Sequence, residues 1–205
     1  EIIEYGNALT MLFVGKSGTG KTMLANAISH HLGKKILLFN FHNLSQIHSM
    51  RVRDEQQVFF FFFREARMND AILFFDESED ILQNRINDLL IEIEKHEGIV
   101  IFATNAEFSI DEAMRRRINL ILNIPDPGPG LRKDIWKIHL PDKMQLEEDV
   151  DLDELARRYE LNGGLIKNAV FSALFQAVNE AQQDNPLVKM EHLEYGARDQ
   201  LQNKL

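Results

Sequence analysis

The residues best suited to chemistry in this 205-residue chain form the stretch GKSGTGKT at residues 15–22. It fits G-x-x-x-x-G-K-[ST] and lies between an apolar stretch and an amphipathic one that begins near Thr22. Glycines allow successive backbone N–H groups to surround an anion, and the dipole of the following helix adds to the attraction. Lys21 supplies a mobile charge for β- and γ-phosphates, and Thr22 supplies a hydroxyl ligand for Mg²⁺. The pattern predicts a nucleotide-binding loop rather than an ordinary glycine-rich turn.

A pair of carboxylates follows a second apolar stretch, residues 71–75. Asp76 is suited to hold Mg²⁺ through its water shell, and Glu77 to orient and activate an attacking water. The alternative is an ordinary loop start after a strand. Beside the phosphate loop, we favour the catalytic interpretation, which predicts triphosphate hydrolysis in addition to binding.

A third candidate, Asn105, follows the apolar stretch at residues 99–104. Ligands of open α/β sheets bind at the carboxyl ends of the strands. An asparagine there can position the same water or contact the γ-phosphate, although a role in a turn is the alternative.

The elements that must position these side chains can be predicted from apolar runs. Five of them are apolar nearly throughout, as expected for a parallel sheet covered on both faces. Helical patterns between them indicate the α/β class. The expected strands cover residues 11–14, 36–39, 71–75, 99–104 and 120–124, and the first expected helix covers 22–32.

The composition changes at PDPGPG, residues 125–130, where we expect a linker that continues neither a strand nor a helix. Beyond it every pattern is helical, so we expect an α/β domain at residues 1–127 and a small four-helix lid at 128–205. The expected lid helices cover residues 131–139, 151–159, 164–182 and 189–204. Because the chain begins at Glu1 and soon reaches a core strand, we expect it to be part of a longer protein.

Composition excludes several classes of function. The net charge of −9 argues against a protein that mainly grips nucleic acid. Without cysteine there is no disulfide, thiol nucleophile or thiolate metal site, which fits a cytoplasmic location. No apolar stretch is long enough for a membrane helix. The seven histidines show no metal-site spacing, so Mg²⁺ is the only metal expected.

These motifs together resemble the AAA+ ATPases, and within them the AAA group. The resemblance is carried by the phosphate loop, the strand end Phe75-Asp76-Glu77, the segment Ala103-Thr104-Asn105 and the helical lid. It implies a P-loop NTPase fold, ATP with Mg²⁺ as ligands, and Asn105 as the sensor-1 residue. It also implies a ring, expected to be a hexamer, in which Arg116 and Arg117 reach a neighbouring subunit's nucleotide.

From the residues alone, the arginines allow two interpretations. Ser109 and Glu112 have the spacing of a capping box, so we expect a short helix that carries the arginines at its far end. Cations there are favourable on dipole grounds alone. Three consecutive arginines nevertheless spread over about 200° of a helix, more than one dipole needs. For the role of arginine finger that the resemblance implies, we rank Arg117 first and Arg116 second.

The resemblance also assigns nucleotide contacts in the lid. His139 would lie near the adenosine, Gly163 and Gly164 would approach adenine with their backbone, and Lys167 occupies a place where some relatives carry a sensor-2 arginine. The alternatives are a solvated helix-end histidine and a plain surface lysine. The full set of candidate nucleotide contacts is Gly15, Lys16, Ser17, Gly18, Thr19, Gly20, Lys21, Thr22, Met23, His139, Gly163, Gly164 and Lys167.

Two segments depart from what is usual in the family. Arg51 stands where unfoldases carry a pore aromatic, and arginine cannot wedge an apolar peptide in the same way. Phe59–Phe63 would cover the whole circumference of a helix. Either that helix is enclosed on most sides, or two or three rings form a contact with another protomer or a partner.

Taken together, the sequence predicts an ATPase module that remodels a protein client within a ring. Two alternatives stay open. One is a scaffold that uses ATP for assembly with little hydrolysis, and the presence of Glu77 speaks against it. The other is a nucleic-acid remodeller, against which the net charge speaks.

Overall fold

The computed structural model of the protein describes residues 8–40, 55–84, 86–105, 111–142, 144–180 and 186–202. The chain divides into two compact units, and each is described by itself. The first comprises residues 1–16 and 21–124, and the second residues 17–20 and 125–205.

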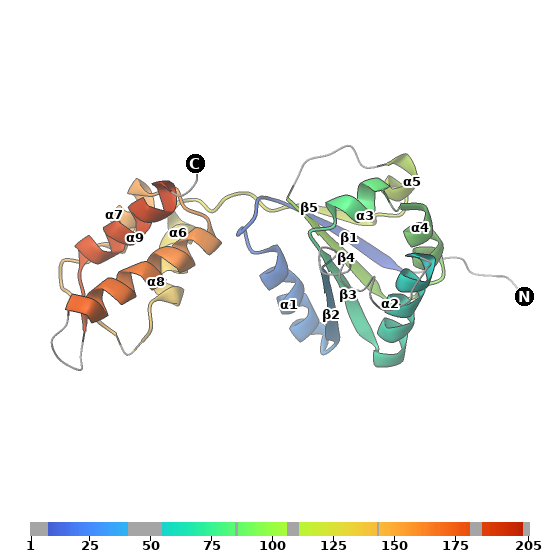
Figure 1. Ribbon diagram of the computed structural model, residues 1–205, viewed down its shortest axis with the longest axis horizontal. Coiled ribbons are helices and arrows are strands. Elements are labelled where there is room, and N and C mark those ends of the chain that lie inside the picture. Colours follow the sequence, from blue (N-terminus) through green and yellow to red (C-terminus); the bar gives the residue numbers. More distant parts are fainter. Residues whose placement is uncertain are drawn as a thin grey trace, which may run out of the picture. The chain divides into compact units, whose positions relative to one another are not determined.

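A five-stranded parallel sheet forms the centre of the first unit, with strand order β2-β3-β4-β1-β5 (Figure 1). This confirms the predicted parallel α/β sheet. The apolar runs locate its strands to within two residues at either end. The strands are β1 (Leu9–Val14), β2 (Lys35–Asn40), β3 (Ala71–Asp76), β4 (Ile99–Thr104) and β5 (Leu120–Asn123).

Helices cover both faces of this sheet (Figure 1). Side chains of a strand alternate between faces, so Ile72 and Phe74 join a core cluster with Ala25 of α1, whereas Leu73 and Phe75 join a cluster on the opposite face. That second cluster contains buried residues of α2 and α4. The helices of this unit are α1 (Lys21–Leu32), α2 (Glu55–Asn69), α3 (Glu79–Asn84), α4 (Ile86–Glu94) and α5 (Glu112–Arg115).

The phenylalanine run lies in α2 and divides between core and surface. Phe59 and Phe63 are fully buried, and Phe62 stacks on Phe39 with 3.9 Å between ring centroids. Phe60 and Phe61 are 45% and 50% exposed and meet edge to face at 5.9 Å. The helix is therefore enclosed on one side, and two rings face outward.

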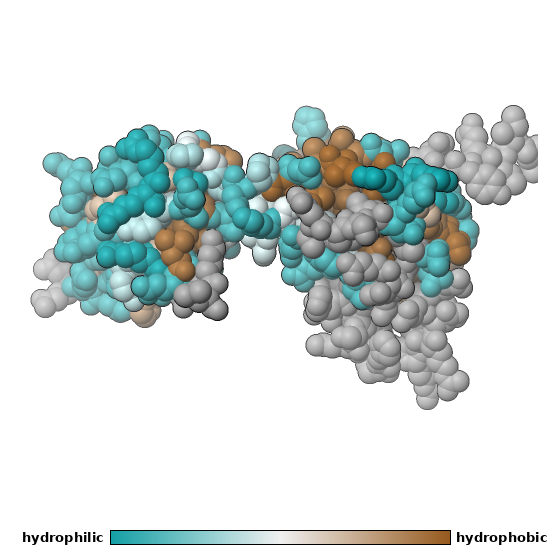
Figure 2. All heavy atoms as spheres, turned by 90° about the horizontal axis from the view of Figure 1, so that it is seen from above, coloured by the Kyte–Doolittle hydropathy of each residue, from teal (hydrophilic) through white to brown (hydrophobic). Residues whose placement is uncertain are grey.

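Other large apolar side chains of the first unit are also exposed, among them Leu120 and Ile121 of the edge strand β5. Figure 2 shows hydrophobic side chains gathered on one face of this unit.

The second unit is built around four helices in its described residues: α6 (Pro129–His139), α7 (Leu152–Arg158), α8 (Gly163–Glu180) and α9 (Met190–Gln202). Trp136 lies fully buried in its core. A Cβ added at Gly196 of α9 would lie 2.2 Å from the carbonyl oxygen of Ala169 in α8, so glycine permits the close approach of these helices. The two-residue strands β6 (Gln145–Leu146) and β7 (Leu187–Val188) pair in parallel and are too short to show a periodicity.

The expected linker at residues 125–130 is wrong at its last two positions. Pro129 and Gly130 form the first turn of α6, with Gly128 as the N-cap. Proline is tolerated there because the first helical N–H has no partner within the helix. None of the helices in the described parts of the chain is long and apolar enough to span a membrane.

Candidate functional site

Three neighbouring strands deliver the candidate residues of the first unit to one edge of the sheet. β3, β4 and β1 are adjacent and parallel, so their carboxyl ends lie side by side. The phosphate-loop stretch follows β1, Glu77 follows Asp76 at the end of β3, and Asn105 follows β4. Gly18 and Gly20 have φ of +80° and +101°, a region that favours glycine.

Lys21 at the start of α1 is buried, and its ammonium group is held by three oxygens. Its Nζ donates to the carbonyl oxygen of Gly15 at 2.6 Å, to that of Lys16 at 2.9 Å and to Oδ1 of Asn105 at 2.7 Å. Burial lowers the pKa of Lys21, and the carboxylates of Asp76, Glu79 and Glu77 oppose this effect. The structure thus brings together Lys21 and Asn105, two side chains that the sequence places 84 residues apart.

Thr22 and Asp76, the two predicted magnesium ligands, also meet. The Thr22 hydroxyl donates to Oδ2 of Asp76 at 2.9 Å. A hydroxyl and a carboxylate are hard oxygen donors, the type that Mg²⁺ prefers, and Mg²⁺ usually keeps several waters. The donor set therefore fits the ion that the sequence implied.

Glu77 has an unusual backbone conformation. Its φ is +50°, in the left-handed region that side-chain-bearing residues seldom adopt. Its own N–H donates to Oδ1 of Asp76 at 3.0 Å. Backbone outliers of this kind gather at functional sites, where surrounding contacts hold them in place.

Two residues that sequence reasoning missed lie directly after Glu77. Both the N–H and the hydroxyl of Ser78 donate to the carbonyl oxygen of Ala103 in β4, each at 2.9 Å. Oε1 of Glu79 accepts from the N–H of Asn105 at 2.5 Å and from the hydroxyl of Thr104 at 3.0 Å. In the sequence, Glu79 looks only like an acidic residue that suits the first turn of a helix.

The short helix α5 starts later than predicted and ends at Arg115, so that Arg116 is its C-cap and Arg117 lies beyond it, which corrects the expectation that the helix carries all three arginines. Its N-cap is Asp111, whose carboxylate accepts the N–H of Ala113 at 2.8 Å, so a start at Ser109 is wrong. Ser109 itself lies outside the described residues. Asparagine and aspartate cap helices at least as well as serine, so a nearby Asp can take the role.

The two candidate finger arginines have different surroundings. Arg116 pairs with Glu112 one turn earlier, and its side chain is 74% exposed. Arg117 is 32% exposed: its Nε donates to Oε1 of Glu94 in α4 at 3.0 Å, and its Nη1 donates to the carbonyl oxygen of Ala113 at 2.9 Å.

The lid candidates all belong to the second unit. Burial, and secondly the positive charge of Lys167, lower the pKa of His139. Within the same unit, the N–H of Gly164 donates to the carbonyl oxygen of Gly18 at 3.0 Å, and Asn162, which the sequence did not single out, donates to that of Ser17 at 2.8 Å.

A Cβ added at Gly163 would lie 3.2 Å from the carbonyl oxygen of Gly18. The lack of a side chain at Gly163 and Gly164 therefore permits their close approach to Gly18.

Met23 on α1 is 74% exposed. Arg51 lies outside the described residues.

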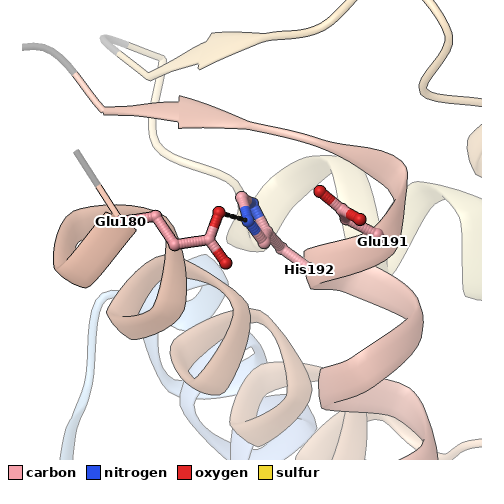
Figure 3. Close-up of side chains that lie close together, drawn as sticks. All are labelled: Glu180, Glu191 and His192. Carbon is pink, nitrogen blue, oxygen red and sulfur yellow. Dashed lines mark hydrogen bonds and ion pairs between the residues drawn. The ribbon is translucent and has the colours of Figure 1, made fainter.

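The structure also gathers three potential metal ligands that the sequence did not suggest: Glu180, Glu191 and His192 in the second unit (Figure 3). Nδ1 of the buried His192 accepts the N–H of Lys189 at 3.2 Å, so Nε2 carries the proton and donates to Glu180 at 2.9 Å. Nζ of Lys189 lies 3.2 Å from Glu191 and 4.0 Å from Glu180. With both ring nitrogens engaged and an ammonium beside the carboxylates, this arrangement is an ion-pair cluster.

Comparison with known proteins supports the assignment that the geometry suggests. Residues 11–126, more than half of the chain, match the ATPase family associated with various cellular activities (AAA). The chain belongs to this family. The family that the motifs resembled is thereby confirmed.

Several curated relatives are similar to this AAA domain. It is 34% identical over 194 residues to Protein SAV of Sulfolobus acidocaldarius, covering 83% of this chain and 24% of the relative. It is 32% identical over 203 residues to the proteasome-activating nucleotidase of Methanosarcina mazei, covering 88% and 47%. It is 29% identical over 192 residues to a katanin p60 ATPase-containing protein of Homo sapiens, covering 82% and 39%. The chain thus spans about a quarter to a half of the length of these relatives.

A solved structure described as "Structural Basis for Katanin Self-Assembly" has the same fold. It superposes with a TM-score of 0.76 at 21% identity, covering 94% of this chain and 71% of the other. The P-loop NTPase fold of the AAA domain is therefore shown, as the sequence predicted.

Proposed function

We propose that this AAA domain binds ATP with Mg²⁺ and hydrolyses it by attack of water on the γ-phosphate. The observation that carries the proposal is the meeting of Lys21, Thr22, Asp76 and Asn105 at one edge of the sheet, with Glu77 held next to Asp76. Membership of the AAA family supports it. The proposal applies to this domain, since the chain covers only part of its relatives.

Each residue has a role that its surroundings permit. Mg²⁺, when bound, would be held by Thr22 and by Asp76 through water, and would neutralise phosphate charge. Lys21 would exchange its bonds to loop carbonyls and Asn105 for phosphate oxygens. Glu77 would take a proton from water as the water oxygen bonds to phosphorus and the bond to the leaving ADP oxygen breaks. Asn105, released from Lys21, would orient that water.

We further propose that the active form is a ring in which Arg116 and Arg117 act on a neighbouring subunit's nucleotide. The pairing of Arg116 with Glu112 is weak because it is exposed to water. Arg117 would exchange Glu94 for the neighbour's phosphates, and such arginines accelerate hydrolysis by about 10³–10⁵-fold. A structure described by its self-assembly shares this fold. A hexamer with a protein client is the form we propose, with cytoplasmic location.

The test is Glu77→Gln, with Glu97→Gln at an exposed position as the matched control. We expect Glu77→Gln to bind ATP and Mg²⁺ like the parent in calorimetry while phosphate release falls about 10²–10⁴-fold. Light scattering of the ATP-bound variant should show a larger mass than that of the nucleotide-free chain.

Three outcomes would contradict parts of the proposal. If calorimetry detected no heat of ATP binding to the folded parent, the proposed nucleotide site would be wrong. Turnover of Glu77→Gln at the parent's rate would instead favour a scaffold that uses ATP for assembly with little hydrolysis. A mass that stays monomeric with ATP would argue against the ring.

A further inference from the structure

Two consecutive residues where β3 passes into α3 attach to the end of the neighbouring strand β4: Ser78 in the connection and Glu79 as the first residue of α3. Ser78, which is fully buried, gives both its N–H and its hydroxyl to the carbonyl oxygen of Ala103. Glu79 accepts two bonds from the next two residues along the chain, the hydroxyl of Thr104 and the N–H of Asn105. We call these four hydrogen bonds the β3–β4 clamp.

The clamp fixes the backbone on one side of Glu77, and Asp76 fixes it on the other. Asp76 Oδ1 accepts the N–H of Glu77 at 3.0 Å, while its Oδ2 accepts from Thr22. Between these two attachments Glu77 has a φ of +50°. A strained backbone persists only where its surroundings over-determine it, and Ser78 supplies that restraint on the carboxyl side.

The same clamp fixes Asn105. This residue follows the last residue of β4, and its N–H is bound by Glu79 at 2.5 Å. Its side chain then reaches Nζ of Lys21 at 2.7 Å. One carboxylate oxygen on α3 therefore orients the residue whose side chain meets the phosphate-loop lysine.

We propose that Ser78 and Glu79 are positioning residues for hydrolysis. They hold Glu77, which follows β3, and Asn105, which follows β4, at fixed positions relative to each other. This rests on the proposed ATPase function. Neither residue donates a proton to the reactants or accepts one from them. They act by holding the proposed base and the proposed water-orienting amide, so their removal should affect the hydrolytic step and leave ATP binding in place.

The test compares Glu79→Ala with Glu79→Gln. Glutamine keeps a carbonyl oxygen of the same reach, able to accept both bonds, while it removes the negative charge and places an NH2 donor where the second carboxylate oxygen was. We expect Glu79→Ala to lower kcat about 10–100-fold, as displacements of about 1 Å do, with KM for ATP within about threefold of the parent. Glu79→Gln should restore kcat to within about threefold of the parent.

A second readout needs no ATP. The amide hydrogen of Asn105, bound to Glu79 in the parent, should exchange faster with solvent in Glu79→Ala and remain protected in Glu79→Gln. Ser78→Ala, which keeps the backbone bond to Ala103, should lower kcat less, by about threefold to tenfold, and serves if Glu79→Ala does not fold.

The outcomes separate this inference from the proposed function. A folded parent without ATP hydrolysis overturns the function. An active parent whose kcat is unchanged in both Glu79→Ala and Ser78→Ala overturns the positioning role. So does a Glu79→Gln variant as slow as Glu79→Ala with the Asn105 amide still protected, because the charge of Glu79 and not its hydrogen bonds would then matter. Loss of kcat with rescue by glutamine supports the clamp.

Discussion

Buried polar side chains near the two ends of β4 differ in whether they are hydrogen-bonded. At the carboxyl end, Thr104 and the neighbouring Ser78 and Lys21 are buried and hydrogen-bonded. At the amino end, His96 is 2% exposed and lies against the ring of Phe63 at 5.2 Å, and neither of its nitrogens has a partner among the described residues.

Burial without a partner penalises the charged form of an imidazole. Burial, and secondly the charge of Arg67, lower the pKa of His96 to about 4. At the carboxyl end, by contrast, three carboxylates partly offset the effect of burial on Lys21. Buried polar groups at the carboxyl end of β4 are thus hydrogen-bonded and belong to the proposed ATPase site, whereas the buried His96 at the amino end makes folding less favourable as the pH falls.

The largest effect is expected at the carboxyl end, from Lys21→Met. Removing the ammonium removes charge stabilisation that strengthens in the transition state, so ATP hydrolysis should fall about 10²–10³-fold. Phosphate release measures this effect, and thermal unfolding should show that the variant folds. Hydrolysis at the parent's rate would show that the hydrogen-bonded lysine is structural and not part of the reaction.

At the amino end we expect an effect on stability instead. The unfolded chain binds a proton at His96 near pH 6.5 and the folded chain only near pH 4. The free energy of unfolding is therefore fully retained above about pH 6.5 and falls as the pH drops towards 4, by up to about 3 kcal/mol from this group.

The matched variant for that prediction is His96→Leu. It should remove this part of the pH dependence in denaturant titrations between pH 7 and pH 4, with ATP hydrolysis at pH 7 near the parent's. A variant whose stability falls with pH as steeply as the parent's would show that His96 is not the group responsible.

The smallest effect is expected from Gly98→Ala. An added Cβ would lie 2.4 Å from Nε2 of His96, whose ring is held by Phe63 and cannot easily move away. We expect a loss of about 1–3 kcal/mol in the free energy of unfolding, as for other overpacked core sites. The double variant with His96→Ala should recover most of it, because the clash is then gone. If Gly98→Ala lowered the free energy of unfolding equally with His96 and with Ala at position 96, contact with His96 would not be the cause of the loss.

The sequence is informative where the signal is local. Lys21 and Thr22 stand in a fixed spacing, and Asp76, Glu77 and Asn105 follow uninterrupted apolar runs, so the strands and these candidates could be predicted directly.

Glu79 could not be predicted, because its bonds exist only once β3 and β4 are neighbours in the sheet. The partner of Arg117 was missed for the same reason, since Glu94 comes from another helix. Asp111 is the N-cap of α5 although the capping-box spacing of Ser109 and Glu112 favours Ser109, because either residue type can cap a helix.

The left-handed backbone at Glu77 has a consequence for how this fold changes over time. Glycine or asparagine would occupy that conformation with less strain than glutamate does. A glutamate at this position therefore costs some folding free energy. Under the proposed hydrolysis, replacement of Glu77 by glycine would make the domain more stable and abolish its turnover, so stability and activity oppose each other at this residue.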